Sequence, residues 1–344
     1  MKTKLVSINP QKFSAKELSE AVSLLRAGEL VAFPTETVYG LGANAFDENA
    51  VAKIFVAKNR PGDNPLIVHI CDKKQLAEVV DQVPKSAELL MKKFWPGPLT
   101  LVLKKSQKIP INVTGALDSV AIRFPSHPIA LALIKESGFP LAAPSANSSG
   151  KPSPTTAQHV LEDLDGKIPL IIDGGSCEIG VESTVLSLAR EKPVLLRPGK
   201  ITLEQLRETI GEVLVHRSVS MQDFVENESS SSEKPLSPGM LYTHYSPKAK
   251  VVLVLPVKGK TFLQSANKLL QEKKAGVISF TKKIGAEEEV FFANDLDAMA
   301  QGLFAAFRDF DEKGVEVVVV EGVSEEGLGL AIMNRLARAA SEII

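Results

Sequence analysis

The sequence has few cysteines and almost no net charge. Only two cysteines, Cys71 and Cys177, occur in 344 residues, and neither belongs to a CxxC pair or a histidine-rich cluster. This scarcity argues against a disulfide framework and against a zinc site. Forty basic and forty-one acidic residues leave a net charge of −1, so no global field draws the chain onto nucleic acid or an anionic membrane. Any site for an anion must therefore be local.

Long apolar runs are also missing. The first residues, MKTKLVSINPQKF, have a positive end but lack the apolar core of a signal peptide, and no later run approaches membrane-spanning length. We therefore expect a cytoplasmic protein without membrane contact. The length exceeds the usual size of one domain, and a hydrophobic content of 44% supplies enough material for two cores.

The common nucleotide-binding fingerprints are absent or incomplete. No GxxxxGK[ST] stretch occurs, which excludes a P-loop enzyme. Gly40, Gly42 and Ala45 loosely fit GxGxxA after a strand, but no acidic residue follows at the distance that a dinucleotide-binding fold requires. We interpret these glycines as a tight turn near a ligand.

Hydrophobic periodicity in the first two thirds of the chain predicts a mixed sheet. Helices are expected over 14–27, where a capping box begins at Ser14, over 47–58 and over 202–210. Short apolar strands broken by prolines are expected at 66–70, 99–103, 120–124, 141–143, 169–172, 184–188 and 194–197. With few and short helices among these strands, the pattern favours a mixed sheet over a regular doubly wound unit.

The last third of the chain is organised differently. Residues 226–234, ENESSSSEK, contain no large apolar group and predict a flexible linker, which the turn-rich segment SPGMLYTHYSP follows. Beyond it, strand-like and helical patterns alternate, which predicts a small parallel sheet covered by helices. We therefore expect a first domain over 1–212, a linker over 213–247 and a second domain over 248–344.

Cations recur among small hydroxyl residues where the expected strands and helices end. Lys58 and Arg60 follow the second helix, Arg123 ends SVAIRFP, Lys151 lies in SSGKPS, and Arg197 ends VLLRPG. Each alone fits a solvated turn or a cap. Together they predict a cavity that binds a polyanion without a P-loop, because guanidinium forks, a lysine charge and backbone N–H groups all bind phosphate or carboxylate oxygens.

The order and the sequences of these motifs resemble those of the Sua5/YrdC family. The motifs span roughly residues 20–200 and are PTETVYGLG, KNRPGDNPLIVHI, FWPGPLT, SVAIRFP, APSANSSGKPS, STV and LRPG. The KxR and SxN pairs that mark the family are present as Lys58, Arg60, Ser145 and Asn147. The segment SPGMLYTHYSP and the appended α/β domain resemble the long Sua5 form more than the short YrdC form.

The resemblance implies a fold and a reaction. The fold is a YrdC-like concave, twisted mixed sheet with helices around one cleft, followed by a small Rossmann-like parallel α/β domain. The reaction forms threonylcarbamoyl-adenylate and pyrophosphate from L-threonine, bicarbonate or CO2, and ATP, for the modification of adenosine 37 in tRNA. Mg2+ would arrive with ATP and be held mainly by phosphates and water. A downstream tRNA threonylcarbamoyl transferase would consume the product.

The resemblance also assigns residues by motif. Implied ATP contacts are Arg60, Asn64, Ser119, Ser145, Asn147, Ser153, Arg197 and, from the segment SPGMLYTHYSP, Tyr242 or His244. Implied threonine contacts are Thr35 or Thr37, His69, Arg123, the backbone at Ala143, and Ser183. Lys58 and Arg60 are the expected catalytic cations, with Lys58 nearest to bicarbonate or the phosphates. A histidine that ends a strand is more often a satisfied core residue, so the motif alone supports the role of His69.

Several alternatives stay open at the level of sequence. A related carbamoyl-transfer enzyme of hydrogenase maturation contains a similar domain, but it adds CxxC zinc repeats and an acylphosphatase module, and this sequence has neither. A module for double-stranded RNA or tRNA needs a broad positive face, which a balanced charge supports weakly. The second domain can be purely structural. The segment SPGMLYTHYSP is either a lid over the cleft, which the resemblance favours, or a strap between the domains, which physics alone favours.

Overall fold

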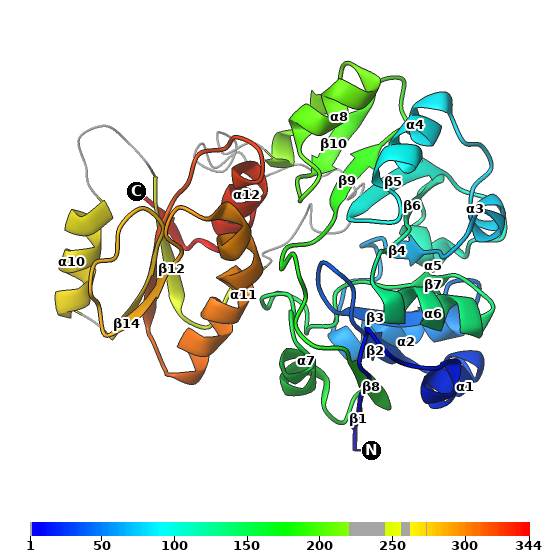
Figure 1. Ribbon diagram of the computed structural model, residues 1–344, viewed down its shortest axis with the longest axis horizontal. Helices are drawn as coiled ribbons and strands as arrows, with labels where there is room; N and C mark the ends of the chain where they lie inside the picture. Colours follow the sequence, from blue (N-terminus) through cyan, green and yellow to red (C-terminus); the bar gives the residue numbers. More distant parts are fainter. Residues whose placement is uncertain (1, 220–244, 256–261, 273) are drawn as a thin grey trace.

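The computed structural model of the chain describes residues 2–219, 245–255, 262–272 and 274–344. These residues form two α/β units, each built around its own β-sheet (Figure 1). The sheet of the first unit has 11 strands in mixed orientation, and the sheet of the second unit has five parallel strands. The expected fold class, a mixed sheet followed by a small parallel α/β sheet, is confirmed.

The first sheet interleaves strands from distant parts of the chain. Its order is β1 (Lys4–Ser7), β8 (Leu170–Asp173), β2 (Val31–Phe33), β3 (Gly40–Asn44), β7 (Leu141–Ala142), β4 (Ile67–His69), β6 (Ser119–Arg123), β5 (Leu99–Lys104), β9 (Thr184–Ser187), β10 (Val194–Arg197) and β11 (Leu214–Val215). The pairs β4–β6 and β5–β9 are parallel, whereas β2–β3, β5–β6 and β9–β10 are antiparallel. All seven strands expected from the sequence are present within one or two residues.

Helices cover this sheet more extensively than the sequence suggested. They are η1 (Ala15–Leu18), α1 (Ser19–Arg26), α2 (Glu48–Lys58), α3 (Lys73–Val79), α4 (Lys85–Phe94), α5 (Ile111–Thr114), α6 (Pro128–Ser137), α7 (Ala157–Leu164), α8 (Leu203–Ile210) and η2 (Arg217–Val219). The three expected helices are confirmed, the first of them with a 3-10 opening turn. The helices of this unit are short, as expected, but they are more numerous than the sequence suggested, because prolines that look like breakers stand at the starts of α4 and α6, where proline is tolerated.

The glycines of β3 have a packing role. Gly40 lies opposite Phe33 in the antiparallel pair with β2, and a Cβ added at Gly42 would lie 2.8 Å from the Phe33 ring. The same ring meets the His69 imidazole edge-on, with 6.2 Å between centroids. The interpretation of these glycines as a tight turn is therefore wrong, because they lie in a buried strand and make room for an aromatic ring.

The second unit follows the alternation expected from the sequence. Its sheet runs in the order β14 (Glu288–Phe291), β13 (Ala275–Ser279), β15 (Val317–Glu321), β12 (Lys250–Val254) and β16 (Glu342–Ile343). Figure 1 shows α11 (Leu296–Glu312) and α12 (Gly329–Ala339) on the side that faces the first unit, and α10 (Phe262–Glu272) on the far side. Within the described ranges, no helix of either unit is long and apolar enough to cross a membrane.

The two units meet through α11 and α12. Gln301 on α11 donates from Nε2 to the backbone oxygen of Cys177 at 3.2 Å, and Asn334 on α12 donates from Nδ2 to the backbone oxygen of Ser218 at 3.1 Å. Gly180 lies so close to α11 that an added Cβ would be 2.3 Å from the Cα of Gln301. The second unit therefore packs directly against the segment that leads into β9.

We predict that Gly180→Ala lowers the midpoint of thermal unfolding more than Gly175→Ala does. Both glycines have a left-handed φ, +80° and +88° respectively, so alanine costs about 1 kcal/mol of backbone strain at either position. At Gly180 the methyl group also meets the backbone of α11, and such overpacking costs about 1–3 kcal/mol. No atom lies within 4 Å of a Cβ at Gly175. Paired unfolding curves measure the difference, and equal midpoints would contradict the close packing of the two units.

Candidate functional site

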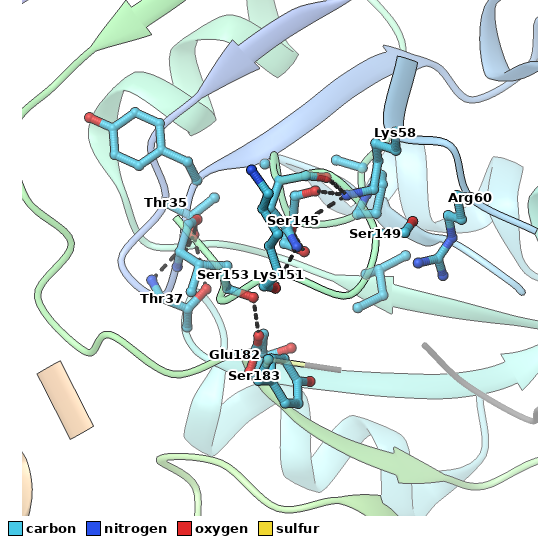
Figure 2. A pocket seen from close by; sticks show the side chains of 18 of the residues that line it. Thr35, Thr37, Lys58, Arg60, Ser145, Ser149, Lys151, Ser153, Glu182 and Ser183 are labelled. Atoms are coloured by element: carbon cyan, nitrogen blue, oxygen red, sulfur yellow. Dashed lines mark hydrogen bonds between the residues drawn. The ribbon is translucent and has the colours of Figure 1, made fainter. Parts of the chain in front are cut away.

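Strand ends of the first sheet and the loops after them line an open cavity, whose empty volume with the adjoining solvent is about 700 Å3. Its walls come from the loop after β2, the last turn of α2, the ends of β4 and β6, the loop over 143–153, and the segments at β9 and β10. Figure 2 shows polar side chains from these separate segments converging on one space. The sequence placed its cations and hydroxyls at the same strand ends.

Most of the predicted site residues line this cavity. They are the cations Lys58, Arg60, Arg123 and Arg197, the hydroxyl residues Thr35, Thr37, Ser145, Ser153 and Ser183, and also His69, Ala143 and Asn147. The structure does not bring Asn64 or Ser119 into the lining. Ser119 opens β6 while Arg123 ends it, about 13 Å further along the strand. Asn64 is buried, and its backbone oxygen is 3.4 Å from Arg60 Nη2. Tyr242 and His244 lie outside the described residues.

The KxR and SxN pairs form one hydrogen-bonded unit. The Lys58 amine, which is 2% exposed, donates to the backbone oxygens of Ser145, at 2.6 Å, and of Asn147. Burial and then the nearby Arg60 lower the pKa of this amine, whereas its oxygen partners favour the charged form. Because its donors point at the turn over 145–147, Lys58 fixes that turn.

Side-chain bonds make the same turn rigid. Ser145 Oγ donates to Asn147 Oδ1 at 2.6 Å. Asn147 Nδ2 in turn donates to the backbone oxygens of Ser148, at 3.0 Å, and of Lys151, at 2.9 Å. Asn147 thus ties the first half of the loop to its second half, where Ser149, Gly150 and Lys151 face the cavity.

Arg123 is the buried cation at the centre of the second group of predicted contacts. Parallel pairing of β4 and β6 places it opposite His69. Its Nη1 donates to Thr37 Oγ1 at 2.7 Å, and its Nη2 lies 2.7 Å from Glu36 Oε1. Arg123 and Glu36 are 4% and 3% exposed. Glu36 escaped the sequence interpretation, although an acid between two small residues in a buried motif signals a paired charge.

A chain of hydrogen bonds orders the loop after β2. Thr35 Oγ1 donates to the backbone oxygen of Val38 at 2.6 Å, so Thr37, 2.9 Å away, must donate to Thr35. Thr37 accepts from Arg123 in turn.

His69 is held in its neutral form. Burial, followed by the charge of Arg123, lowers the pKa of His69 to about 3, and its Nδ1 lies 3.2 Å from the backbone oxygen of Ile67. The imidazole is therefore neutral at physiological pH.

Ser183 and Arg197 join the last two strands at the cavity wall. Arg197 donates from Nε to the backbone oxygen of Ser183 at 3.0 Å and from Nη2 to its Oγ at 3.1 Å. The Ser183 hydroxyl also shares a hydrogen bond of 2.7 Å with Thr100. The predicted threonine contact and the predicted ATP contact therefore touch each other.

Glu182 is a lining residue that the sequence interpretation missed. Its Oε1 accepts a hydrogen bond of 2.5 Å from Ser153 Oγ, drawn in Figure 2, and its Oε2 accepts one of 2.8 Å from Arg335 Nε on α12. Burial acts to raise the pKa of the Glu182 carboxyl, but Arg335 and then Arg197 outweigh it and lower that pKa. The signal in the sequence was an acidic residue within the otherwise buried run VESTVLS.

Tyr245 is a further missed residue, and it lies near the end of the segment SPGMLYTHYSP. It lines the cavity, is 5% exposed and stacks on Phe304 of α11, with 5.2 Å between ring centroids. The next residue, Ser246, donates from its backbone N to the backbone oxygen of Gly150 at 2.9 Å. This end of the segment therefore touches both units at the cavity, and the choice between lid and strap stays a prediction.

The cavity suits an anionic ligand. Within the described ranges, no group of three or more His, Cys, Asp or Glu side chains is placed to hold a metal ion. The carboxylates at the cavity are already engaged, Glu36 with Arg123 and Glu182 with Arg335. Besides the neutral imidazole of His69, the other polar side chains of the lining are cations, hydroxyls and an amide, which bind phosphate and carboxylate oxygens better than they bind a divalent cation.

A mixed sheet that gathers buried cations and hydroxyls around one cavity defines an α/β protein with a site suited to anions. Two family models cover nearly all of the chain. The model for Sua5, YciO and YrdC proteins, described as telomere recombination, matches residues 23–199, and the model for the C-terminal domain of threonylcarbamoyl-AMP synthase matches residues 201–341. The chain belongs to the Sua5/YrdC family, in its long two-part form.

Relatives match along almost their whole length. The threonylcarbamoyl-AMP synthase of Pyrococcus abyssi is 50% identical over 328 residues, which cover 93% of both chains. The enzyme of the same name from Bacillus subtilis is 50% identical over 336 residues, covering 94% of this chain and 93% of that one. The crystal structure of P. abyssi Sua5 complexed with L-threonine superposes with a TM-score of 0.91 at 47% identity and covers 99% of both chains.

We predict that Lys58→Met abolishes ATP binding and lowers the midpoint of thermal unfolding. The change leaves buried oxygens of the turn over 145–147 without their donor, and each unsatisfied group costs about 1–3 kcal/mol. Lys53→Met on the same helix is the matched control, because its partner Glu29 is half-exposed and such a pair contributes about 0–1 kcal/mol. Titration calorimetry and thermal unfolding measure both effects. Unchanged ATP affinity in Lys58→Met would show that the turn does not depend on this amine.

Proposed function

We propose that this chain is a nucleotidyltransferase that forms L-threonylcarbamoyladenylate and pyrophosphate from L-threonine, bicarbonate or CO2, and ATP. The observation that carries the proposal is the meeting of two predicted groups in one cavity. The Lys58–Asn147 unit and Arg60 form one side, and Arg123 with Thr37 and His69 forms the other. Relatives of near-identical length with this activity in their names support the same reaction.

The threonine side of the cavity offers groups that fit an amino acid. Arg123 can share its guanidinium between Glu36 and a substrate carboxylate, since a planar fork has five donors. A neutral His69 and the hydroxyls of Thr37 and Ser183 can exchange hydrogen bonds with the substrate hydroxyl and amine. The carboxylate of Glu36 supplies a negative charge near the position of the substrate amine.

The proposed reaction proceeds without a covalent enzyme intermediate. The threonine amine adds to CO2 and loses a proton, which gives a carbamate. A carbamate oxygen then attacks the α-phosphorus of ATP, the new O–P bond forms, and the bond to the bridging oxygen breaks to release pyrophosphate. Both reactants are anions, so the contribution of the protein is to hold them in line and to neutralise their charge. Arg60 and Lys151 both line the cavity and can neutralise part of the phosphate charge.

Mg2+ fits this scheme as a partner of ATP. Bound to phosphate oxygens, it would neutralise charge that develops on the leaving pyrophosphate. The engaged state of Glu36 and Glu182 leaves phosphates and water as its ligands. We further propose a cytoplasmic location. We also propose that a downstream tRNA threonylcarbamoyl transferase consumes the product, because an acyl adenylate is a reactive mixed anhydride. Direct contact with tRNA or double-stranded RNA has no support from the net charge of −1.

We predict that the purified chain, with threonine, bicarbonate and MgATP, releases pyrophosphate and accumulates the adenylate. In Arg60→Ala this threonine-dependent release falls about a hundredfold or more, because one preorganised charged contact to a reacting phosphate is lost. Mass spectrometry of the adenylate and a coupled pyrophosphate assay provide the two measurements. Pyrophosphate release that does not depend on threonine, or wild-type turnover in Arg60→Ala, would overturn the assignment.

We also predict that threonine is preferred to valine by about a hundredfold or more in kcat/KM. A site that bonds a substrate hydroxyl leaves its own buried polar groups unpaired when that hydroxyl is missing. Thr37 and Ser183 are 0% exposed and supply such groups. Serine, which lacks only a methyl group, is the nearest competitor and the control. Equal rates with valine would contradict a hydroxyl-binding pocket.

A further inference from the structure

We propose that Arg335, a residue of the second unit, is a positioning residue for the ATP cavity of the first. Arg335 acts through one buried carboxylate, that of Glu182. It fixes the direction of the hydrogen bond between Ser153 and Glu182, and with it whether the Ser153 hydroxyl donates to the substrate or accepts from it. The proposal rests on the function proposed above. It gives the second unit a defined part in substrate binding, in place of a purely structural one.

The geometry is a short chain of buried contacts that crosses from one unit to the other. Arg335 is 0% exposed, Glu182 is 6% exposed and Ser153 is 1% exposed. The Nε of Arg335 donates to Oε2 of Glu182 at 2.8 Å, and Ser153 Oγ donates to Oε1 of the same carboxylate at 2.5 Å. Glu182 and Ser153 both line the cavity, whereas Arg335 stands behind them. Arg335 can therefore influence a ligand only through its neighbours.

The direction of the hydrogen bond decides what Ser153 can bind. An ionised carboxylate only accepts hydrogen bonds, so the single proton of the Ser153 hydroxyl is committed to Glu182. The lone pairs of that oxygen then remain for the ligand. Ser153 must accept a hydrogen bond from a donor on the nucleoside part of ATP, such as a hydroxyl or an amino group, and it cannot donate to a phosphate oxygen. A protonated Glu182 would be able to donate to Ser153 and reverse this direction.

Arg335 is the principal partner that keeps Glu182 ionised. The charged and titratable groups that act on this carboxyl are Arg335, Arg338 and Tyr245 from the second unit's side and Arg197 from β10. Arg335 donates a hydrogen bond of 2.8 Å to this carboxylate and is the largest charged influence that lowers its pKa. Burial is the largest single influence on Glu182 and opposes ionisation. Loss of Arg335 therefore lets burial raise the pKa of Glu182.

A second contact from the same unit holds the other side of Ser153. Arg308 on α11 donates from Nη2 to the backbone oxygen of Pro152 at 2.6 Å and to Asp163 at 2.9 Å. Asp163 also accepts from the Lys151 amine at 2.8 Å. The residues on either side of Pro152 are thus each linked to the second unit through one carboxylate of the first unit, Lys151 through Asp163 and Ser153 through Glu182.

The test is the KM for ATP in Arg335→Gln, measured across a range of pH. We expect a rise of about ten- to hundredfold, the effect of losing a hydrogen bond to a buried charge. The rise should be largest at acid pH, where Glu182 becomes protonated, and should diminish toward alkaline pH, where Glu182 ionises without its partner. The KM for threonine should change much less. Arg335→Lys keeps the positive charge and should restore the wild-type pH profile.

Two further variants separate positioning from folding. Gln301→Ala removes an inter-unit hydrogen bond remote from Glu182 and should leave the pH profile unchanged. The double variant Glu182→Gln, Arg335→Gln buries no lone charge, and it should bind ATP more weakly than wild type by a factor that does not change with pH. If Arg335→Gln does not fold, the pH dependence of ATP binding is measured in Arg335→Lys and in the double variant, with the outcomes stated above for each.

Calorimetric titration of ATP alone separates this proposal from the proposed reaction, because it needs no turnover. A wild-type protein that binds ATP without forming the adenylate would contradict the reaction and leave the positioning role measurable. The role of Arg335 is overturned if the ATP affinity of Arg335→Gln follows the wild-type pH profile. It is equally overturned if the acid loss persists in the double variant, where no carboxyl remains at position 182.

Discussion

The cavity depends on charges that are neutralised inside the protein before any ligand arrives. Lys58, Arg123, Arg197, Glu182 and Arg335 are each at most 6% exposed, and an unpaired ion at such depth costs several kcal/mol. Each of them therefore has internal oxygen or charge partners, and those partners are the loops that shape the cavity. The groups proposed to bind an anion and the groups that fix the site are thus the same side chains, so a ligand would meet donors that are already in place.

The sheet explains why these partners meet. Burial on both faces of the first sheet, by cores that include Leu41 on one side and Phe33 on the other, fixes the register of the central strands. A slip of one residue in β4 or β6 would exchange apolar and polar side chains between faces, and His69 would no longer lie opposite Arg123. The polar residues at the strand ends are therefore placed by apolar packing that they do not themselves contribute.

Local chemistry in the sequence was enough to predict most of this cavity. Cations beside glycine, proline and hydroxyl residues mark strand ends, which is how Lys58, Arg60, Arg123 and Arg197 were found. The missed residues have another origin. Glu36 and Glu182 look like surface acids in a linear sequence, because their partners lie 87 and 153 positions away. Ser119 lies outside the lining for a related reason, since a motif does not reveal which end of its strand faces the cavity, and its contact with ATP stays a prediction.

The second unit shows most clearly why a list of motifs is incomplete. Its own sequence has few polar residues arranged like a site, which left a purely structural interpretation open. Yet α11 and α12 direct Arg308 and Arg335 away from their own sheet and into the loop of Ser153 and the carboxylate of Glu182. A buried arginine is retained at an interface only where it meets acceptors, and here those acceptors belong to the cavity wall. The interface between the two units is therefore continuous with the substrate site, and a change in how the units pack is also a change in the cavity.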